Sequence, residues 1–496
     1  MNIINIMNFI RTKEPRNLDD EKKLFKTTEL QLELVRKHGI PATYLFEYDA
    51  LCDSRFVNLF KENDGDDIEL GIWYEIVKPM TDAVGMKWRG REGMDWDWHA
   101  VPTFSMSYTK KEREQLADET MRKFREVFGY YPRVFGTWIM DSYTMEYLAE
   151  NYDIDAFCLC RDQTNTDAET QLGGYFNNPY YACKKNSLCP AQTKEEQIDV
   201  PVLRLLGSCP IHCYDGGKYA KTVNHGCFTL EPVWVLGRRP EAVDWMFDTY
   251  FKNGNIGLQY IHTGQENSFV YDQIIEPLDM QLEKINRLDN VKIMKMGETG
   301  KYIKENYPMT APSSVFARND WTGEDLQSSY YSCKNYMSDL FYREGKIYLR
   351  ALYKFDENFA DRYLDTPNDN WTVTYENLPV VDTAVWGENT DDCGLFINGA
   401  KGHFDCSSDG DTLVASAEGC EIRFSENKIV FSGCSLSLRL GDCIPEIKFG
   451  NDAIDYTFLG YKYRVPVDGI IKETDGGADI LPKEDGKITF YMANNK

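Results

Sequence analysis

Hydrophobic and polar positions along the first 300 residues follow two alternating patterns. Short apolar runs that suit strands are each followed by stretches with an apolar residue every three or four positions, as in a helix that packs on a core. We expect strands at residues 4–10, 42–48, 68–75, 134–140, 155–160, 256–263 and 291–296. We expect helices at about 18–38 and at 143–150. A further helix should begin at a capping box, Thr109–Glu112, and end near Gly129, and another should run from Pro240 to about Gly254. A long helix should follow the strand at 256–263 and end near residue 288.

The repeated strand–helix order predicts a parallel sheet whose strands are joined by crossover helices. Seven or eight such units in about 300 residues favour an α/β fold of the (β/α)7 type, a TIM-like barrel, over an open Rossmann sheet. A loop-rich insertion is expected at about 161–230. No GxGxxG or GxxxxGK[ST] motif follows a strand, so a nucleotide-binding function has no support in the sequence.

The pattern changes after about residue 311. Short β-type runs begin with KIYLRALYKF at 346–355 and are separated by turn sequences such as Asn398-Gly399 and Asp485-Gly486. We expect a C-terminal β-sandwich-like domain here. The sequence therefore predicts two domains, a barrel at 1–310 that carries the catalytic site and a β-rich domain at 311–496.

The composition argues against two classes of partner. The 496 residues carry a formal net charge of −24, and such a surface repels nucleic acid and anionic membranes. There is no run of 18 apolar residues and no signal-peptide pattern at the N-terminus. We expect a cytoplasmic protein, with a leader trimmed from the sequence left open, and we make no prediction of its oligomeric state.

Metal-binding patterns are weak in this chain. The 14 cysteines are scattered without a repeated CxxC pair, and the six histidines include no HxH or HxxxH pair. We interpret the cysteines as mostly reduced thiols and predict neither a metal nor a cofactor.

Acidic residues gather at the ends of the expected strands. In a barrel the reacting groups lie at the C-terminal ends of the strands, so these carboxylates are the candidates for chemistry. They are Glu47, Asp49, Glu75, Asp141, Asp162 (followed by Gln163) and Glu266. Each has a structural alternative: Glu47 and Asp49 could pair with basic side chains or cap a helix, Asp141 could be a helix N-cap, and Glu266 could belong to a first helical turn.

An aromatic and acidic cluster, Trp96-Asp97-Trp98-His99, follows the third expected strand. Its rings could stack on a sugar, although a lone histidine such as His99 is more often a hydrogen-bonded structural residue. The residues that we expect to bind substrate are Trp98, His99, Asp162, Gln163, Glu47, Trp138 and Gln265.

Several segments resemble the glycoside hydrolase/deacetylase superfamily of (β/α)7 barrels, which includes family-57 and family-38 glycoside hydrolases and NodB-type polysaccharide deacetylases. GIPATYLFEYDAL and IELGIWYE resemble strand segments of the deacetylases, and FGYYPRVFGTWIMDSYTMEYLAENYDIDAF resembles a family-57 segment. That likeness places Asp141 at the position of the family-57 nucleophile, and HTGQENSF places Glu266 near the acid/base. WRGREGMDWDWHA and TGQENSF look closer still to a group of gut-bacterial proteins of unestablished activity in which this barrel precedes a β-domain.

The departures from these families concern the metal ligands. A deacetylase needs an Asp-Asp pair at the first strand, and family-57 enzymes have an H-x-H motif there, but this strand ends in Asn-Phe-Ile-Arg. Trp73 to Glu75 stand where a deacetylase histidine is expected, and Thr263 or Gly264 takes the place of an acidic residue before Glu266. The departures favour a metal-independent enzyme.

We predict a glycoside hydrolase that acts on an oligo- or polysaccharide through two carboxylates. Asp141 is the expected nucleophile and Glu266 the expected acid/base, with Glu75 the substitute for either. Two alternatives stay open: a metal-dependent deacetylase that uses His99, Asp141 and Asp162, and a glycan-binding protein without catalysis.

Overall fold

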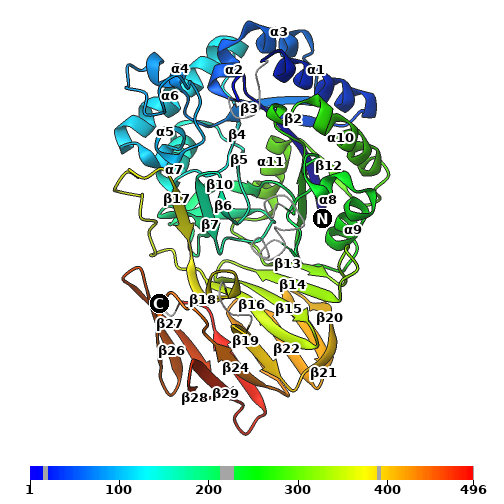
Figure 1. Ribbon diagram of the computed structural model, residues 1–496, viewed down its shortest axis with the longest axis vertical. Helices are drawn as coiled ribbons and strands as arrows, with labels where there is room; N and C mark the ends of the chain where they lie inside the picture. The colour runs from blue at the N-terminus through cyan, green and yellow to red at the C-terminus, as the bar shows by residue number, and fades with distance from the viewer. Residues whose placement is uncertain (15–20, 213–227, 388–391, 495–496) are drawn as a thin grey trace.

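The structure, a computed structural model, describes residues 1–14, 21–212, 228–387 and 392–494. A helix-covered parallel sheet occupies the upper part of Figure 1, and antiparallel sheets occupy the lower part. The architecture changes between the end of α11 (Met296–Asn306) and the start of β13 (Ser313–Ala317).

The curled sheet of the N-terminal part has ten strands in the described residues, and seven of them form a row of parallel strands. In spatial order the seven are β11 (Gln259–Thr263), β1 (Asn2–Ile10), β2 (Ala42–Phe46), β3 (Ile68–Trp73), β4 (Val134–Thr137), β5 (Ala156–Leu159) and β10 (Gln197–Arg204). The short β12 (Lys292–Ile293) pairs in parallel with β1 beside this row, and two antiparallel strands, β8 (Tyr180–Cys183) and β9 (Asn186–Pro190), lie at one edge. The first half of β1 pairs with β11 and its second half with β2, a stagger that curls the sheet. The prediction of an α/β barrel-type fold followed by a β-rich region is confirmed, with the sheet forming part of a barrel.

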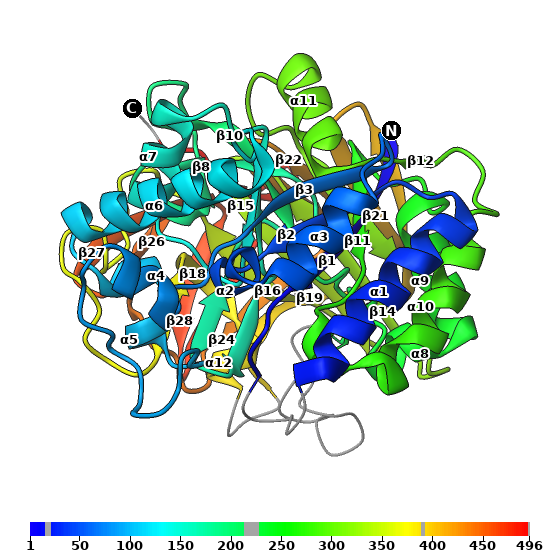
Figure 2. The same cartoon turned by 90° about the horizontal axis from the view of Figure 1, so that it is seen from above.

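The helices pack around this sheet, as the view in Figure 2 shows. The longer ones are α1 (Glu21–His38), α6 (Lys110–Phe128), α7 (Ser142–Asn151), α9 (Pro240–Phe251), α10 (Tyr271–Ile285) and α11. The shorter ones are α2 (Tyr48–Cys52), α3 (Ser54–Glu62), α4 (Lys78–Ala83), α5 (Ala100–Thr103) and α8 (Val235–Arg238). The capping box at the start of α6 is confirmed, since the Thr109 side chain accepts from the Glu112 amide and Glu112 accepts from the Thr109 amide.

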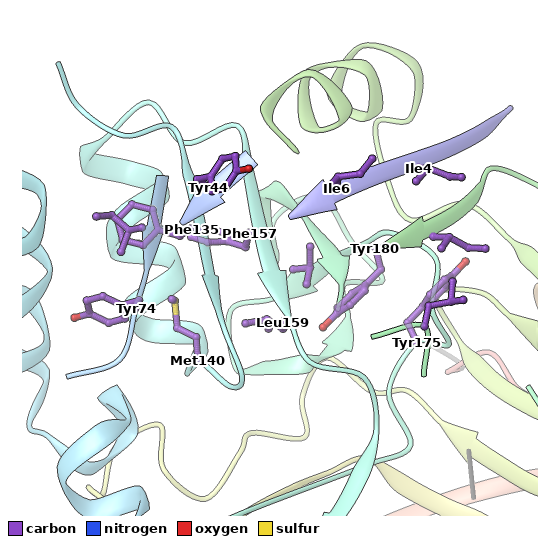
Figure 3. Packing of buried hydrophobic residues seen from close by; sticks show 14 of the residues in the cluster. Ile4, Ile6, Tyr44, Tyr74, Phe135, Met140, Phe157, Leu159, Tyr175 and Tyr180 are labelled. Atoms are coloured by element: carbon purple, nitrogen blue, oxygen red, sulfur yellow. The ribbon is translucent and has the colours of Figure 1, made fainter. Parts of the chain in front are cut away.

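Both faces of the parallel sheet are buried, which explains the continuous apolar runs in its strands. Every second residue of the strands packs in an apolar cluster with side chains of the surrounding helices; Ile4, Tyr44 and Phe157 are examples in Figure 3. The residues between them, for example Met7 and Leu45, pack inside the curled sheet.

The segment expected as a loop-rich insertion at 161–230 holds five strands in the parts that the structure describes, 161–212 and 228–230. They are β6 (Gln163–Thr166), β7 (Glu169–Leu172), β8 (Tyr180–Cys183), β9 (Asn186–Pro190) and β10. The last of these pairs in parallel with β5 and is the seventh strand of the series. Its sequence QIDVPVLR hid it, because Asp199 and Pro201 interrupt the apolar pattern of a buried strand.

A side chain links the two outer parallel strands, β10 and β11. The backbone N–H of Leu206 donates to Nδ1 of His262 over 2.9 Å, and the described residues contain no strand ladder between β10 and β11. Burial lowers the pKa of His262 to about 4, so the imidazole is neutral and can accept this bond.

The C-terminal part contains two large antiparallel sheets. The first has the order β13, β14 (Leu326–Ser332), β15 (Tyr336–Arg343), β16 (Lys346–Lys354), β19 (Gly394–Asn398), β24 (Ser435–Arg439), β29 (Gly477–Leu481) and β28 (Ile470–Thr474), with β18 (Leu378–Asp382) on β16. The second has the order β20 (Lys401–Asp409), β21 (Thr412–Glu418), β22 (Cys420–Ser425), β23 (Lys428–Ser432), β30 (Lys487–Tyr491), β27 (Tyr461–Asp468), β26 (Ala453–Phe458) and β25 (Glu446–Phe449). Apolar residues of both sheets share one core, and the short helix α12 (Thr383–Trp386) adds Trp386 to it.

The main apolar core crosses from the barrel into the first antiparallel sheet. Val315, Tyr330 and Phe341 of that sheet belong to the same buried cluster as the outer residues of the barrel strands. In addition, β17 (Val373–Glu376) returns to pair in parallel with β7. The division into domains at 1–310 and 311–496 stays a prediction, and this shared core bears on it.

No helix in the described parts of the chain is both long and apolar enough to span a bilayer.

Candidate active site

A buried guanidinium lies at the C-terminal end of β1, surrounded by carboxylates. Arg11 ends 3.1 Å from Glu266, 3.3 Å from Glu75, 3.6 Å from Glu14 and 3.9 Å from Glu47, measured between the nearest nitrogen and oxygen atoms. All five side chains are at most 5% exposed. The structure therefore brings together Glu47, Glu75 and Glu266, three residues that the sequence analysis singled out separately; we call the five residues the Arg11 cluster.

The barrel topology explains this convergence. Glu47 follows β2 and stands at the N-cap of α2, Glu75 lies two residues beyond β3, and Glu266 lies three residues beyond β11. Adjacent parallel strands end at the same edge of the sheet, so side chains just beyond them meet there. Residues far apart in sequence thus share one site.

The position of Arg11 is fixed by its backbone and by an indole. Asn267 accepts from the Arg11 amide over 3.1 Å and donates to the Arg11 carbonyl over 2.9 Å. The guanidinium lies 4.7 Å from the ring centre of Trp96, in cation–π contact. Burial by itself would lower the pKa of Arg11, but the charges of Glu75, Glu266, Glu47 and Glu14 more than offset this and raise it.

Glu75 is held by two tryptophans. The indole N–H of Trp73 donates to one of its oxygens over 2.9 Å, and that of Trp96 donates to the other over 2.7 Å. Trp138, beyond β4, meets the Trp73 ring edge-on with the centroids 5.2 Å apart. Trp138, a predicted substrate-binding residue, therefore contacts Trp73, one of the two tryptophans that hold Glu75.

Glu231 is a further buried carboxyl group that the sequence analysis missed. It accepts from Gln265 over 3.0 Å and from the Trp234 indole over 2.8 Å. Burial, followed by the charge of Glu266, raises the pKa of Glu231 to about 7. Only its nearness to Glu266 in space reveals it, because no expected strand precedes the segment Thr229-Leu230-Glu231.

Glu47 and Asp49 form a second pair of buried carboxyl groups beside Arg11. Burial, then the charge of Asp49, raises the pKa of Glu47 well above its ordinary value, and burial also raises the pKa of Asp49. One oxygen of Asp49 accepts from the amide and the hydroxyl of Thr12. The alternative that these acids pair with a basic side chain holds for Glu47, through Arg11.

Asp141 lies in a different set of contacts. It is the N-cap of α7, where its oxygens accept from the Thr144 amide and hydroxyl and from Ser105, and it forms a 2.8 Å ion pair with Arg113 of α6. The N-cap alternative for Asp141 is confirmed. Within the described residues none of its hydrogen bonds or ion pairs reaches the Arg11 cluster.

Trp98 and His99 lie further out. Asp97 accepts from His99 and from Arg91, while the Arg91 guanidinium lies 3.9 Å from the ring centre of Trp98. His99 also meets the ring of Trp371, a half-exposed residue from the C-terminal part, with centroids 4.6 Å apart. His99 is thus a hydrogen-bonded, partly exposed histidine, and ring contacts through Trp98 and Trp96 connect it to the Arg11 cluster.

The remaining predicted residues lie on two sides of the site. Gln265 accepts from the Val233 amide and donates to Glu231, so it holds that carboxyl group. Asp162 pairs with Arg204 at the end of β10 over 2.8 Å. Gln163 begins β6, and its side chain lies outside the described part of the structure.

The residues of the site do not fit a metal ion. Arg11 stands where the resemblance to deacetylases and family-57 enzymes would require ligands, and its positive charge already faces the carboxylates. The described residues contain no group of three or more His, Cys, Asp or Glu side chains arranged to hold a metal. This donor set favours chemistry by carboxyl groups.

Comparisons with known proteins agree with the fold. Residues 40–320 match the family model described as a domain of unknown function with solved structure, DUF3863. A crystal structure from Parabacteroides distasonis, provisionally named a glycoside hydrolase/deacetylase, superimposes with a TM-score of 0.58 at 15% identity and covers 77% of this chain and 91% of that one. The resemblance to this superfamily is therefore confirmed at the level of fold.

Other solved structures are similar more loosely. A probable polysaccharide deacetylase from Pseudomonas aeruginosa gives a TM-score of 0.39 at 13% identity, covering 62% of this chain and 92% of that one. A family-57 branching enzyme from Thermococcus kodakaraensis gives 0.31 at 11% identity, covering 62% and 71%. A search of the curated proteins gave no significant match.

Proposed function

The chain belongs to the DUF3863 family, whose description states no activity, and from the geometry of the site we propose that it is a carbohydrate-active hydrolase that cleaves a glycosidic bond with two carboxyl groups. The observation that carries this proposal is the convergence of carboxyl groups from separate strand ends on one buried guanidinium. A provisional glycoside hydrolase/deacetylase with the same fold is in keeping with a carbohydrate substrate.

Glycosidic cleavage needs one protonated carboxyl group and one ionised carboxylate. Two neighbouring acids in different environments can supply both states at neutral pH. The pKa of Glu231 is raised to about 7 by burial and by the charge of Glu266, which favours its protonated form. Glu266 lies 3.1 Å from the guanidinium of Arg11, and such an ion pair stabilises the charged form of a carboxylate.

We therefore assign Glu231 as the acid that protonates the leaving oxygen and Glu266 as the nucleophile or base. Glu75 is the substitute for Glu266, because it shares the same guanidinium nitrogen of Arg11. We propose that sugar rings or hydroxyls are bound beside the Arg11 cluster by Trp138, Trp98 and His99. For Asp141, the expected nucleophile, we now propose a structural role, because its oxygens are engaged with Arg113, Ser105 and Thr144.

The test is turnover of a glycoside found by screening, measured for Glu231→Gln, Glu266→Gln and Asp141→Asn. We expect each glutamine variant to lose at least a hundredfold in kcat, since each removes a group that acts on the scissile bond. The folded fraction of Asp141→Asn should turn the glycoside over at a rate close to that of the unaltered chain. Glu126→Gln is the matched control, because Glu126 is half-exposed on α6 and pairs with Arg122 and Lys123 of the same helix.

The outcomes separate the alternatives. Near-normal rates for Glu266→Gln would refute the assignment, and loss of rate in folded Asp141→Asn would return the nucleophile to Asp141. A chelator-sensitive enzyme would support the deacetylase hypothesis instead. If the unaltered chain binds glycans but hydrolyses none of the glycosides screened, the result would support the binding-protein hypothesis.

A further inference from the structure

Two cysteine thiols meet in the C-terminal part of the chain. Cys420 is the first residue of β22, and Cys434 lies between the end of β23 and the start of β24. The Cys420 thiol donates to the sulfur of Cys434, with the two sulfur atoms 3.0 Å apart, and both cysteines are free. The sulfur atoms of a disulfide are about 2.05 Å apart, so a shift of about 1 Å would allow the bond to form.

Two glycine turns hold the backbone around these thiols. The ladder between β22 and β23 ends one residue after Cys420 and two residues before Cys434. Gly419 and Gly433 have φ values of +85° and +78°, and a Cβ atom on Gly433 would lie 2.7 Å from the carbonyl oxygen of Gly419. The two turns can approach this closely because glycine has no side chain. This backbone contact places the two cysteines at neighbouring positions.

The contact makes the two thiols chemically unequal. The hydrogen bond from Cys420 lowers the pKa of Cys434, and the same bond, followed by burial, raises the pKa of Cys420. The thiolate is the nucleophilic form of a cysteine, so Cys434 is the better nucleophile of the two. By contrast, burial raises the pKa of the partly exposed Cys406 to about 12, which disfavours its thiolate.

Access to the pair is narrow. Cys420 is 7% exposed and Cys434 is 5% exposed, so an oxidant the size of water reaches them more readily than a bulky disulfide does. Cys183 and Cys189 are a second pair of thiols in hydrogen-bond contact, at the β8–β9 hairpin, but both are 0% exposed. The second pair therefore offers the same chemistry without access from solvent.

We propose that Cys434 and Cys420 are a modification site, a disulfide formed by hydrogen peroxide, with Cys434 as the attacking thiolate and Cys420 as the resolving thiol. The Cys434 sulfur attacks one peroxide oxygen, the O–O bond breaks, and the hydroxide that leaves takes up a proton to become water. The Cys420 sulfur then attacks the sulfenic acid on Cys434, the S–S bond forms and the S–O bond breaks. The second water carries away the Cys420 proton, so two thiols and one peroxide give a disulfide and two waters.

The disulfide would connect the two large antiparallel sheets. Cys420 begins β22 of the second sheet, and Cys434 directly precedes β24 of the first. A covalent link between them restricts the unfolded chain and so stabilises the folded state. We expect the oxidised chain to unfold at a temperature about 2 °C or more above that of the reduced chain.

The test is peptide mapping of the full chain after oxidation. The protein is reduced with a phosphine, desalted and treated with hydrogen peroxide, and the remaining thiols are blocked with N-ethylmaleimide. Trypsin cuts after Arg423 and Lys428, between Cys420 and Cys434, so the disulfide appears as two cross-linked peptides. We expect this link to form at least tenfold faster than a link within the Cys183 and Cys189 pair.

Serine variants separate the two roles. In Cys420→Ser the sulfenic acid on Cys434 has no resolving thiol, so dimedone should label Cys434 at least tenfold more than in the unaltered chain. In Cys434→Ser the attacking thiolate is missing, and labelling of Cys420 should be at least tenfold lower than that. Cys406→Ser is the matched control, because it removes a more exposed thiol, and it should change the rate of the link less than twofold. Thermal unfolding checks that each variant is folded.

A peroxide-treated chain without the cross-linked peptides would overturn the proposal, as would equal rates for the two cysteine pairs or equal labelling of the two serine variants. If the serine variants do not fold, the two pairs in the unaltered chain decide the question by themselves. A link that the phosphine does not remove is a permanent disulfide and overturns the peroxide step. A link that forms without raising the unfolding temperature overturns the stabilising effect.

Discussion

At the scale of single residues, Arg11 controls the charge of the site. Four glutamates lie within 3.9 Å of its guanidinium, and all are buried. Carboxylates packed this closely in a protein interior would repel one another without a cation between them. The side chain that the sequence analysis passed over is therefore the one that allows the predicted acids to converge.

Replacing Arg11 with methionine should destabilise the protein by about 3–5 kcal/mol at pH 8, the usual cost of removing one partner from a buried ion pair. The loss should be smaller at pH 5, because protonation neutralises carboxylates that have lost their cation. Urea unfolding at both pH values measures this. Arg122→Met is the control: Arg122 is 57% exposed at the side chain and pairs with Glu119 and Glu126 on α6, so it should cost about 1 kcal/mol or less. Equal losses for the two variants would contradict the role given to Arg11.

Glu231 gives the stability a defined dependence on pH. Its pKa is about 7 in the folded chain against an ordinary value of 4.5, so the folded state holds a proton that the unfolded state releases between these values. Its contribution to the free energy of unfolding therefore falls as pH rises from about 4.5 to 7 and is constant above that. Glu231→Gln lacks this fall, so its stability relative to the unaltered chain should improve by about 2–3 kcal/mol between pH 5 and pH 8. A stability difference that does not change with pH would contradict the raised pKa.

At the scale of elements, the turn after β11 aims Gln265 and Glu266 into the site. Gly264 has a φ of +124°, and a Cβ atom there would lie 1.9 Å from the carbonyl oxygen of Met7 on β1. The strand can end so close to its neighbour only because this residue has no side chain. The absence of an acidic residue before Glu266, noted from the sequence, thus has a steric cause at this position.

Gly264→Ala should lower the free energy of unfolding by several kcal/mol and shift Glu266 away from Arg11. Gly254→Ala is the matched control: Gly254 also has positive φ, at +69°, but a Cβ atom there meets nothing within 4 Å. That variant should cost only about 1–2 kcal/mol, the conformational cost by itself. Chemical denaturation of both proteins measures the difference, and similar losses would show that contact with Met7 is unimportant.

At the scale of the whole molecule, the barrel and the first antiparallel sheet share one core. Val315, Tyr330 and Phe341 pack in the cluster that covers the barrel strands, and Arg113 of α6 donates to the carbonyl of Tyr363. The strand β17 also pairs with β7, so the C-terminal part contacts the barrel at several separate places. These contacts imply that the two parts stabilise one another.

A protein that ends at residue 310 should therefore fail to form a stable monomer. It would expose the apolar residues that pack on Val315 and Tyr330, which favours aggregation. Size-exclusion chromatography and binding of a hydrophobic dye test this, with the full chain as the comparison. The full chain should unfold in one transition by tryptophan fluorescence and circular dichroism alike. A stable, monomeric 1–310 protein would show that the predicted domain boundary is also a folding boundary.

The sequence by itself determined the type and order of most barrel elements, the capping box of α6 and the β-rich C-terminal part. These follow from local periodicity and from short-range capping, which are written in neighbouring residues. It also identified Glu47, Glu75 and Glu266 as strand-end acids, because the rule that places them needs only the strand positions.

The tertiary structure decided which of these acids meet and what surrounds them. The partnership of Arg11 with Glu266 joins positions 255 residues apart, Glu231 follows no recognisable strand, and β10 is hidden by Asp199 and Pro201. In the sequence Asp141 is a strand-end acid like Glu266. In the structure it pairs with Arg113 and caps α7, so its contacts lie outside the Arg11 cluster. Burial, ion pairing and pKa depend on neighbours in space, and no local pattern of residues specifies those neighbours.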